Sequence, residues 1–252
     1  MTTSANTLPL AGKVAFVTGG SRGIGAAIVR RLAADGATVV FSYAASQGPA
    51  DELVRSVEAA GGRAQAVRID SADAAALNAG IDKAAADFGR LDILVNSAGV
   101  LLLGPVDQFS LEDFDRTLAV NVRAVFVATK AATAHMKDGG RVINIGSTNA
   151  GRMPFAGGGV YAMSKSALVG LVQGLARDLG PRGITINNVQ PGPVNTDMNP
   201  ENGPSAGLMQ SFMAIQRHGQ PEEIAGMVSY LASPAAAFVT GASLTIDGGF
   251  AA

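Results

Sequence analysis

The sequence of 252 residues contains no cysteine and no tryptophan, and only 15% of its residues are charged. Without cysteine, the chain cannot form a disulfide scaffold, a thiolate metal site or a cysteine nucleophile. The charged share is well below the usual quarter and 48% of the residues are hydrophobic, so the chain can bury a large core. Lysine and arginine (19) nearly balance aspartate and glutamate (20), which gives no general attraction to nucleic acid or an anionic membrane.

Targeting, membrane and metal signals are also missing. Residues 1–13 contain no basic segment followed by an apolar run, so no signal peptide is predicted. The long uncharged stretch 224–246 has Pro234 near its middle, which favours a helix, a turn and a strand over a membrane span. His135 and His218 lie far apart, so no metal site is expected. These absences predict a cytoplasmic protein with no membrane or nucleic-acid partner.

Glycine, by contrast, is abundant, with 32 residues, and many of these glycines fall between apolar segments of alternating type. Short runs rich in β-branched residues alternate with segments of helical period. This alternation predicts an α/β fold, a single doubly wound Rossmann-type domain over 1–252 with about seven parallel strands and helices on both faces. The strands are expected at 13–18, 38–43, 64–69, 91–96, 141–145, 184–189 and 244–246, and the helices at 24–35, 49–60, 72–88, 111–136, 161–179 and 221–231.

A glycine-rich turn of the pattern G-x-x-x-G-x-G joins the first strand to the first helix. Gly19 permits a tight turn, Gly23 permits close approach to a pyrophosphate, and Gly25 lets the helix pack near the sheet. The free N–H groups of the helix N-terminus attract phosphate. Because ligands in such sheets bind beyond the carboxyl ends of the strands, this turn predicts a dinucleotide site, although a glycine-rich connection without a ligand has the same pattern.

The end of the second strand distinguishes the two nicotinamide cofactors. Residues 41–46 contain no acid that could bind the ribose 2′-hydroxyl of NAD. Arg22 in the glycine turn can reach a 2′-phosphate, and Ser42, Tyr43 and Ser46 offer hydroxyl groups. The sequence therefore favours NADPH (NADP+), the alternative being that Arg22 is a solvated loop residue.

A tyrosine and a lysine, Tyr161 and Lys165, share one helix face at i and i+4. A neighbouring ammonium favours the phenolate, so Lys165 is expected to lower the pKa of Tyr161 and suit it to proton transfer during hydride transfer. Ser147, after the fifth strand, could hydrogen-bond a substrate carbonyl oxygen. Asn121 lies in an apolar helical stretch, either as a hydrogen-bonded core residue or as a helix distortion that holds a relay water.

Together these motifs resemble the short-chain dehydrogenase/reductase family, from about residue 10 to residue 249. The matching motifs are the glycine turn 18–25, the segment 96–99, Asn121, Ser147, Tyr161 with Lys165, and the turn Pro191-Gly192. Two features depart from the family pattern. Ser97 replaces the second asparagine of its N-N-A-G motif, and the interval from Ser147 to Tyr161 is one residue longer than is common. Either the loop before Tyr161 carries an extra residue, which we favour, or Thr148 takes the role of Ser147.

The resemblance implies a catalytic tetrad of Asn121, Ser147, Tyr161 and Lys165. Tyr161 would be the general acid/base, Lys165 would also bind the nicotinamide ribose, Ser147 would hold the substrate oxygen, and Asn121 would hold a relay water. An acid at Asp70 would lie beside the adenine. Thr196 would lie near the nicotinamide amide, and family members are usually tetramers or dimers. The expected cofactor-binding residues are Gly19, Ser21, Arg22, Gly23, Ile24, Gly25, Ser42, Tyr43, Ser46, Asp70, Ser71, Asn96, Ala98, Gly99, Tyr161, Lys165, Pro191, Gly192, Val194 and Thr196.

A substrate loop is expected over 193–216, where Met198, Leu208 and Phe212 would supply an adaptable apolar face. Segments 151–154, 190–204 and 217–223 are similar to a bacterial branch of the family that contains reductases of the 3-oxoacyl-[acyl-carrier-protein] type and a biofilm-dispersal protein proposed to bind cyclic di-GMP. The sequence thus predicts an NADPH-dependent ketoreductase that forms a homotetramer, a dimer of dimers. The alternative is a sensor that binds a cyclic dinucleotide in the cofactor pocket.

Overall fold

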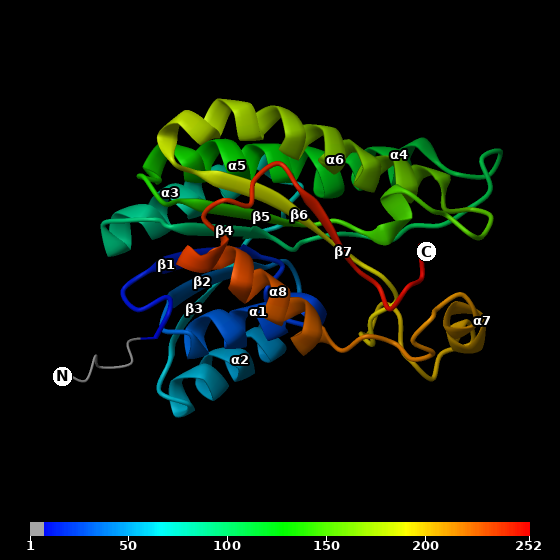
Figure 1. Ribbon diagram of the computed structural model, residues 1–252, viewed down its shortest axis with the longest axis horizontal. Helices are drawn as coiled ribbons and strands as arrows, with labels where there is room; N and C mark the ends of the chain where they lie inside the picture. Colours follow the sequence, from blue (N-terminus) through cyan, green and yellow to red (C-terminus); the bar gives the residue numbers. More distant parts are fainter. Residues whose placement is uncertain (1–7) are drawn as a thin grey trace.

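The computed structural model describes residues 8–252, in which seven strands form one parallel sheet. The strand order is β3-β2-β1-β4-β5-β6-β7, so the direction in which strands are added reverses between β1 and β4 (Figure 1). This confirms the doubly wound Rossmann-type sheet, whose ligand crevice lies at such a reversal. The strands are β1 (Val14–Thr18), β2 (Thr38–Tyr43), β3 (Arg63–Arg68), β4 (Ile93–Asn96), β5 (Arg141–Ile145), β6 (Thr185–Pro191) and β7 (Ser243–Ile246).

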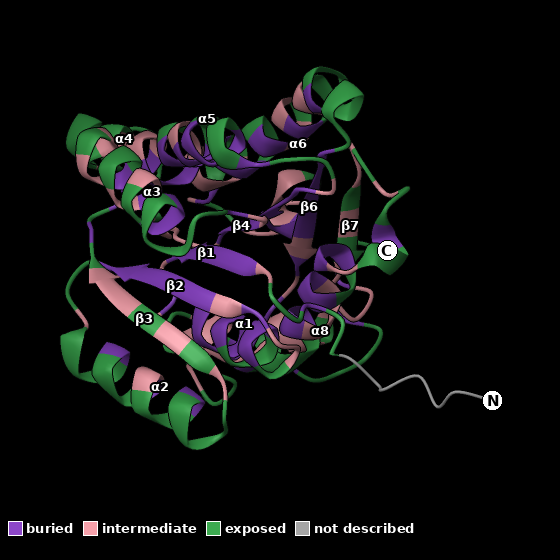
Figure 2. Ribbon diagram, turned by 90° about the vertical axis from the view of Figure 1, so that its left-hand side faces the viewer, coloured by how far each residue is buried: buried purple, intermediate pink, exposed green. Residues whose placement is uncertain are grey.

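Helices cover both faces of the sheet. In Figure 1, α1, α2 and α8 lie on one face and α3, α4, α5 and α6 on the other. Each face has its own apolar cluster, and the central strands are buried on both sides (Figure 2). The helices are α1 (Gly23–Ala34), α2 (Gln47–Ala59), α3 (Ala74–Phe88), α4 (Leu111–Leu118), α5 (Ala124–His135), α6 (Gly159–Leu179), α7 (Ala206–Ser211) and α8 (Pro221–Ala232).

Two predicted helices differ from those in the structure. The helix predicted over 111–136 is divided into α4 and α5 by a π-helical turn, Ala119–Arg123. The helix predicted over 49–60 begins earlier, at Gln47. The uncharged stretch 224–246 is indeed the end of α8, a turn and β7. Within residues 8–252, no helix has both the length and the apolar character needed to cross a membrane.

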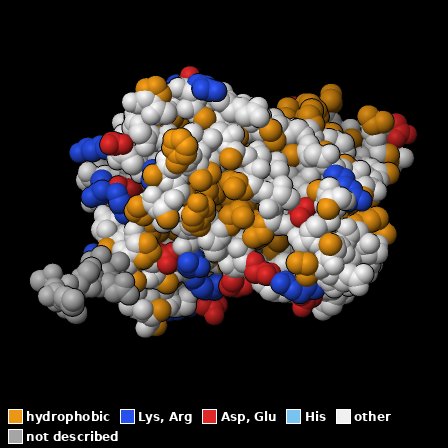
Figure 3. All heavy atoms as spheres, viewed as in Figure 1, with side chains coloured by type: hydrophobic (Ala, Val, Ile, Leu, Met, Phe, Trp, Pro, Cys, Tyr) orange, Lys and Arg blue, Asp and Glu red, His pale blue; other side chains and the backbone are white. Residues whose placement is uncertain are grey.

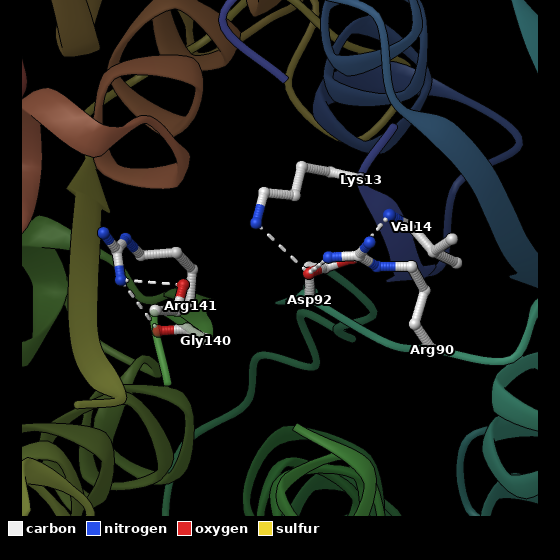
Figure 4. A network of polar contacts seen from close by, with 7 residues as sticks. Lys13, Val14, Arg90, Asp92, Gly140 and Arg141 are labelled. Atoms are coloured by element: carbon white, nitrogen blue, oxygen red, sulfur yellow. Dashed lines mark hydrogen bonds and ion pairs between the residues drawn. The ribbon is translucent and has the colours of Figure 1, made fainter. Parts of the chain in front are cut away.

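Charged residues at the amino ends of the central strands make structural contacts. Asp92 accepts hydrogen bonds from the Val14 amide (2.9 Å), from Lys13 Nζ (3.3 Å) and from two nitrogens of Arg90 (2.7 and 2.8 Å) (Figure 4). These contacts join the start of β1 to the segment before β4. They lie at the edge opposite the glycine turn and so leave the carboxyl ends of the strands for a ligand.

Candidate active site

The glycine turn after β1 packs directly against the turn after β4. Gly19 has φ +66°, and a Cβ on it would lie 2.7 Å from the Ala98 Cα. The Thr18 hydroxyl accepts hydrogen bonds from the amides of Ser97 and Ala98 (both 3.1 Å). A Cβ on Gly25 would overlap the Gly19 carbonyl oxygen. These contacts explain the two glycines, whereas the role of Thr18 depends on a contact between distant segments and was not predicted.

Ser42 supports this turn from behind. Its side chain is buried, its hydroxyl accepts a hydrogen bond from the Gly19 amide (3.3 Å), and its carbonyl oxygen accepts one from Gly20 (2.8 Å). The structure therefore gives Ser42 a role in shaping the turn, which differs from the predicted contact with a 2′-phosphate. Tyr43 is also buried, whereas Ser46 is half-buried just before α2.

Arg22 extends from the glycine turn into solvent. Its side chain is 63% exposed and its only ion pair in residues 8–252 is a long one, 3.9 Å, to Asp197, which is 77% exposed. Such a surface pair contributes little stability, so the guanidinium is available to an anion. A depression of about 310 Å³ opens beside it between the first turns of α1, α2 and α8. It is lined by Ser21, Arg22, Gly23, Ala26, Arg30, Pro49, Glu52, Leu53, Pro221 and Glu222.

Tyr161, Ser147 and Lys165 come together where β5 ends and α6 begins. The half-buried Tyr161 phenol lies beside the Ser147 side chain, and the buried Lys165 Nζ lies 5.8 Å from the tyrosine ring centroid. Lys165 Nζ donates a hydrogen bond to the Ile145 carbonyl oxygen (2.9 Å). The neighbouring Thr148 hydroxyl is engaged with Asp247 Oδ2 (3.0 Å). This geometry favours Ser147 over Thr148 as the partner of Tyr161.

Burial sets the protonation of both groups. It raises the pKa of the Tyr161 phenol, and the neighbouring Ser147 hydroxyl offsets only part of that rise. It lowers the pKa of Lys165 to about 8, because the ammonium loses its contact with water. The sequence predicted that Lys165 would lower the pKa of Tyr161. In the structure, burial has the larger effect and raises this pKa. At neutral pH Tyr161 is protonated and can donate.

Asn121 lies in the π-helical turn, where it is both a hydrogen-bonded core residue and the site of a helix distortion, and the relay water stays a prediction. Its side-chain amide is fully buried and satisfied: Oδ1 accepts from the Val100 amide (2.9 Å), and Nδ2 donates to the Val100 carbonyl (2.9 Å) and to Ser164 Oγ (3.0 Å). The helix is also distorted at this residue, as expected near functional sites. Ser164 in turn donates to the Tyr161 carbonyl (2.7 Å), a link that the sequence did not suggest.

The asparagine and the glycine of segment 96–99 have different structural roles. The Asn96 side chain is buried and donates to Asn144 Oδ1 (2.9 Å), which ties β4 to β5. A Cβ on Gly99 would lie 3.5 Å from Asn121 Oδ1 and 3.6 Å from Lys165 Nζ. Gly99 is therefore part of the same site as Asn121 and Lys165, whereas Asn96 holds the sheet together.

Two other predicted residues, Asp70 and Thr196, contact different segments. The Asp70 carboxylate accepts hydrogen bonds from the Ala72 amide (3.0 Å) and from both terminal nitrogens of Arg116 (3.0 and 3.2 Å), and these contacts lower its pKa. Thr196 lies against the glycine turn, since a Cβ on Gly23 would come 3.3 Å from its methyl group. Four further predicted residues are neighbours of Asp70 or Thr196 in the sequence. Ser71 and Val194 are buried, and Pro191 ends β6 just before Gly192.

Comparison with known proteins agrees with this arrangement. Residues 19–251 match the family model described as enoyl-(acyl carrier protein) reductase. A short-chain dehydrogenase/reductase from Serratia marcescens is 63% identical, with a TM-score of 0.96 and coverage of 97% of this chain and 100% of its own. A short-chain dehydrogenase from Burkholderia cenocepacia, solved in complex with NADP, is 52% identical, with a TM-score of 0.95 and the same coverage.

The cyclic-di-GMP-binding biofilm dispersal mediator protein of Escherichia coli is 52% identical over 241 residues, which are 96% of this chain and 98% of that protein. All of these matches span nearly the whole chain, including the glycine turn and the segments that carry Tyr161 and Lys165. The resemblance found in the motifs is thus confirmed, and the chain belongs to the short-chain dehydrogenase/reductase family.

Proposed function

We propose that this oxidoreductase is an NADPH-dependent carbonyl reductase, which transfers hydride between the nicotinamide and a ketone or secondary alcohol. The observation that carries the proposal is the meeting of Ser147, Tyr161 and Lys165 beside Gly99, with Asn121 joined to them through Ser164. A protein that only bound a nucleotide would have no chemical need for a protonated phenol and a buried ammonium at one place.

The bound cofactor would supply the hydride, and the chain would supply the proton and the alignment. Tyr161 donates its phenolic proton to the substrate oxygen, which is possible at neutral pH because burial raises the pKa of this residue. Ser147 holds the same oxygen by a hydrogen bond. Lys165 would hold the nicotinamide ribose and stabilise the phenolate that remains, and the π-helical distortion at Asn121, rather than its satisfied side chain, would hold the relay water.

The structural features of the glycine turn fit a phosphorylated dinucleotide. The turn is closely packed, α1 begins at Gly23 with no side-chain cap, and Arg22 is exposed beside it. The NADP bound by the Burkholderia cenocepacia relative supports the same cofactor here. Arg22 would bind the 2′-phosphate, Asp70 would lie near the adenine and Thr196 near the nicotinamide amide. Residues 193–216, which include α7, would form the substrate loop of a single domain.

Replacing Arg22 by alanine is expected to weaken NADPH binding about 10- to 100-fold and NADH binding less than about twofold, because only NADPH presents a phosphate to the guanidinium. Enhancement of the cofactor's fluorescence on binding measures both affinities. Arg55→Ala, at an exposed arginine on α2, is the matched control. Equal losses for the two cofactors would exclude a 2′-phosphate contact.

The proposed activity is tested by following NADPH absorbance with a panel of aliphatic ketones, aryl ketones and β-keto esters. Turnover of at least one class, abolished by a Tyr161 variant, is the expected result. The alternative function, sensing of a cyclic dinucleotide, is favoured by one finding, the name of the Escherichia coli relative. If no ketone of the panel is turned over and cyclic di-GMP binds tightly in competition with NADPH, the reductase proposal is wrong and this alternative is favoured.

We also propose that the chain is a homotetramer, a dimer of dimers. Strand β7 pairs only with β6, and its free edge carries no charge, unlike the other edge strand β3. Apolar side chains gather over α8 and β7 in Figure 3, and Tyr230 and Phe238 are exposed there. Another exposed aromatic residue, Phe126 on α5, lies on the other layer. Exposed aromatic residues on both layers support two interfaces, and a monomer in sedimentation velocity would contradict this proposal.

A further inference from the structure

The last residues of the chain, 247–252 (the terminal segment), join two loops that border the candidate active site. Asp247 accepts a hydrogen bond from Thr148, the residue after Ser147. The Gly248 carbonyl oxygen accepts one from the Ile215 amide (2.8 Å), at the end of the substrate loop. Phe250 is buried, with 1% of its surface exposed. The terminal segment is thus held by both the loop that precedes Tyr161 and the loop proposed to cover the substrate.

Arg152 lies at the centre of this junction. Its Nη1 donates a hydrogen bond to the Phe250 carbonyl oxygen. Its guanidinium carbon lies 5.8 Å from the ring centroid of Phe212 and 5.6 Å from that of Phe250. The two rings contact each other edge to face, with centroids 6.0 Å apart. One cation therefore touches the end of α7 and the terminal segment from a third segment, the loop 149–158.

These contacts are of a kind that fixes position. Arg152 forms no ion pair with a carboxylate in residues 8–252, so its charge is directed to the aromatic faces. A guanidinium within about 6 Å of an aromatic centroid is attracted to the ring, more strongly where solvent is excluded, as it is at Phe250. An edge-to-face aromatic pair adds a geometric preference. Without Arg152, nothing else in the loop 149–158 contacts Phe212 and Phe250 in this way.

We propose that Arg152 is a positioning residue, which holds α7 and the terminal segment against the loop that follows Ser147 and thereby fixes the outer wall of the substrate site. The kinetic part of this inference rests on the proposed reductase activity, and the conformational part does not. The clamp reaches the substrate loop and not the glycine turn. Loss of Arg152 is therefore expected to affect ketone binding and to spare cofactor binding.

The conformational test is limited digestion of the purified protein with chymotrypsin, with the cut sites identified by mass spectrometry. In Arg152→Met, which retains an unbranched side chain but no cation, cleavage within 206–213 is expected to accelerate about tenfold. Cleavage at the exposed Phe88, which ends α3 and makes no contact with Arg152, provides an internal reference. Arg152→Lys, which retains a cation, should restore most of the protection, and Arg55→Met is the matched control. Unchanged cleavage within 206–213 would overturn the proposal even if the enzyme proved inactive.

The kinetic test compares KM, kcat and the NADPH dissociation constant. Arg152→Met is expected to raise the ketone KM about tenfold, to change kcat less than about threefold, and to leave the affinity for NADPH within about twofold. Phe212→Leu should raise the ketone KM by a similar factor. The double variant should raise it little further, because both changes remove the same contact between Arg152 and Phe212. A loss confined to ketones that carry a carboxylate or phosphate would overturn the positioning role, since Arg152 would then bind the substrate itself.

Discussion

Tyr161→Phe is expected to reduce carbonyl reduction by a factor of about 100 to 10,000 while leaving NADPH binding nearly intact. The variant retains the ring, and with it the packing at the start of α6, and removes only the phenolic oxygen beside Ser147. General acid catalysis by one positioned side chain contributes a factor of this size. The measurement is kcat/KM for the best ketone of the panel, beside the NADPH dissociation constant from cofactor fluorescence.

The pH dependence gives an independent check on the same group. Burial raises the pKa of Tyr161, so the donating form is present throughout the neutral range. Reduction should therefore be maintained up to alkaline pH and then fall as the phenol ionises. Oxidation of the alcohol, which needs the phenolate, should increase over the same range. Retention of more than about a tenth of the wild-type kcat/KM in Tyr161→Phe would remove this residue from the proton-transfer role.

The parts of the fold and site that the sequence predicted are those encoded by neighbouring residues. The glycine turn, the parallel sheet and the pair Tyr161–Lys165 each depend on spacing within one strand, turn or helix, so a pattern in the sequence was sufficient. Asn121 lies between these cases. A polar residue in an apolar helical stretch indicated a distortion, and the structure has a π-helical turn there, but a regular helical period could not define where α4 ends.

The features that were not predicted depend on contacts between distant segments. Thr18 accepts hydrogen bonds from residues nearly 80 positions away, and Thr148 bonds to Asp247 across 99 positions. Ser42 was expected to face a phosphate, yet it is buried behind the glycine turn because β2 pairs with β1 in a register that the sequence does not specify. The same reason applies to the pKa of Tyr161, for which sequence spacing revealed the ammonium at i+4 but not the extent of burial.

Lys165→Met is expected to lower kcat/KM at least about 100-fold and, at the same time, to stabilise the folded protein at pH 7. The activity falls because the variant cannot hold the ribose or stabilise the phenolate. The stability rises because a buried ammonium is replaced by an apolar side chain of similar length. Burial lowers the pKa of Lys165 from 10.5 to about 8, and that difference corresponds to about 3 kcal/mol of unfolding free energy at pH 7.

The sign of this effect can be checked by changing the pH. Below pH 8 the amine is charged in both the folded and the unfolded chain, so the wild type bears the full penalty of burying the charge. Between pH 8 and 10.5 the folded chain releases this proton before the unfolded chain does, so the wild type gains stability relative to the variant. The advantage of Lys165→Met should therefore shrink to less than about 1 kcal/mol at pH 10.

Urea unfolding of both proteins at pH 7 and at pH 10 measures the difference directly, and other titrating groups cancel because they are common to both. Lys137→Met, at an exposed lysine, is the matched control and should change stability little at either pH. The prediction is wrong if Lys165→Met is no more stable than the wild type at pH 7, or if its excess unfolding free energy grows with pH. Either result would show that burial of the Lys165 ammonium does not destabilise the fold. The expected result instead makes Lys165 a group that the fold tolerates at the expense of stability, as is reasonable for a residue retained for chemistry.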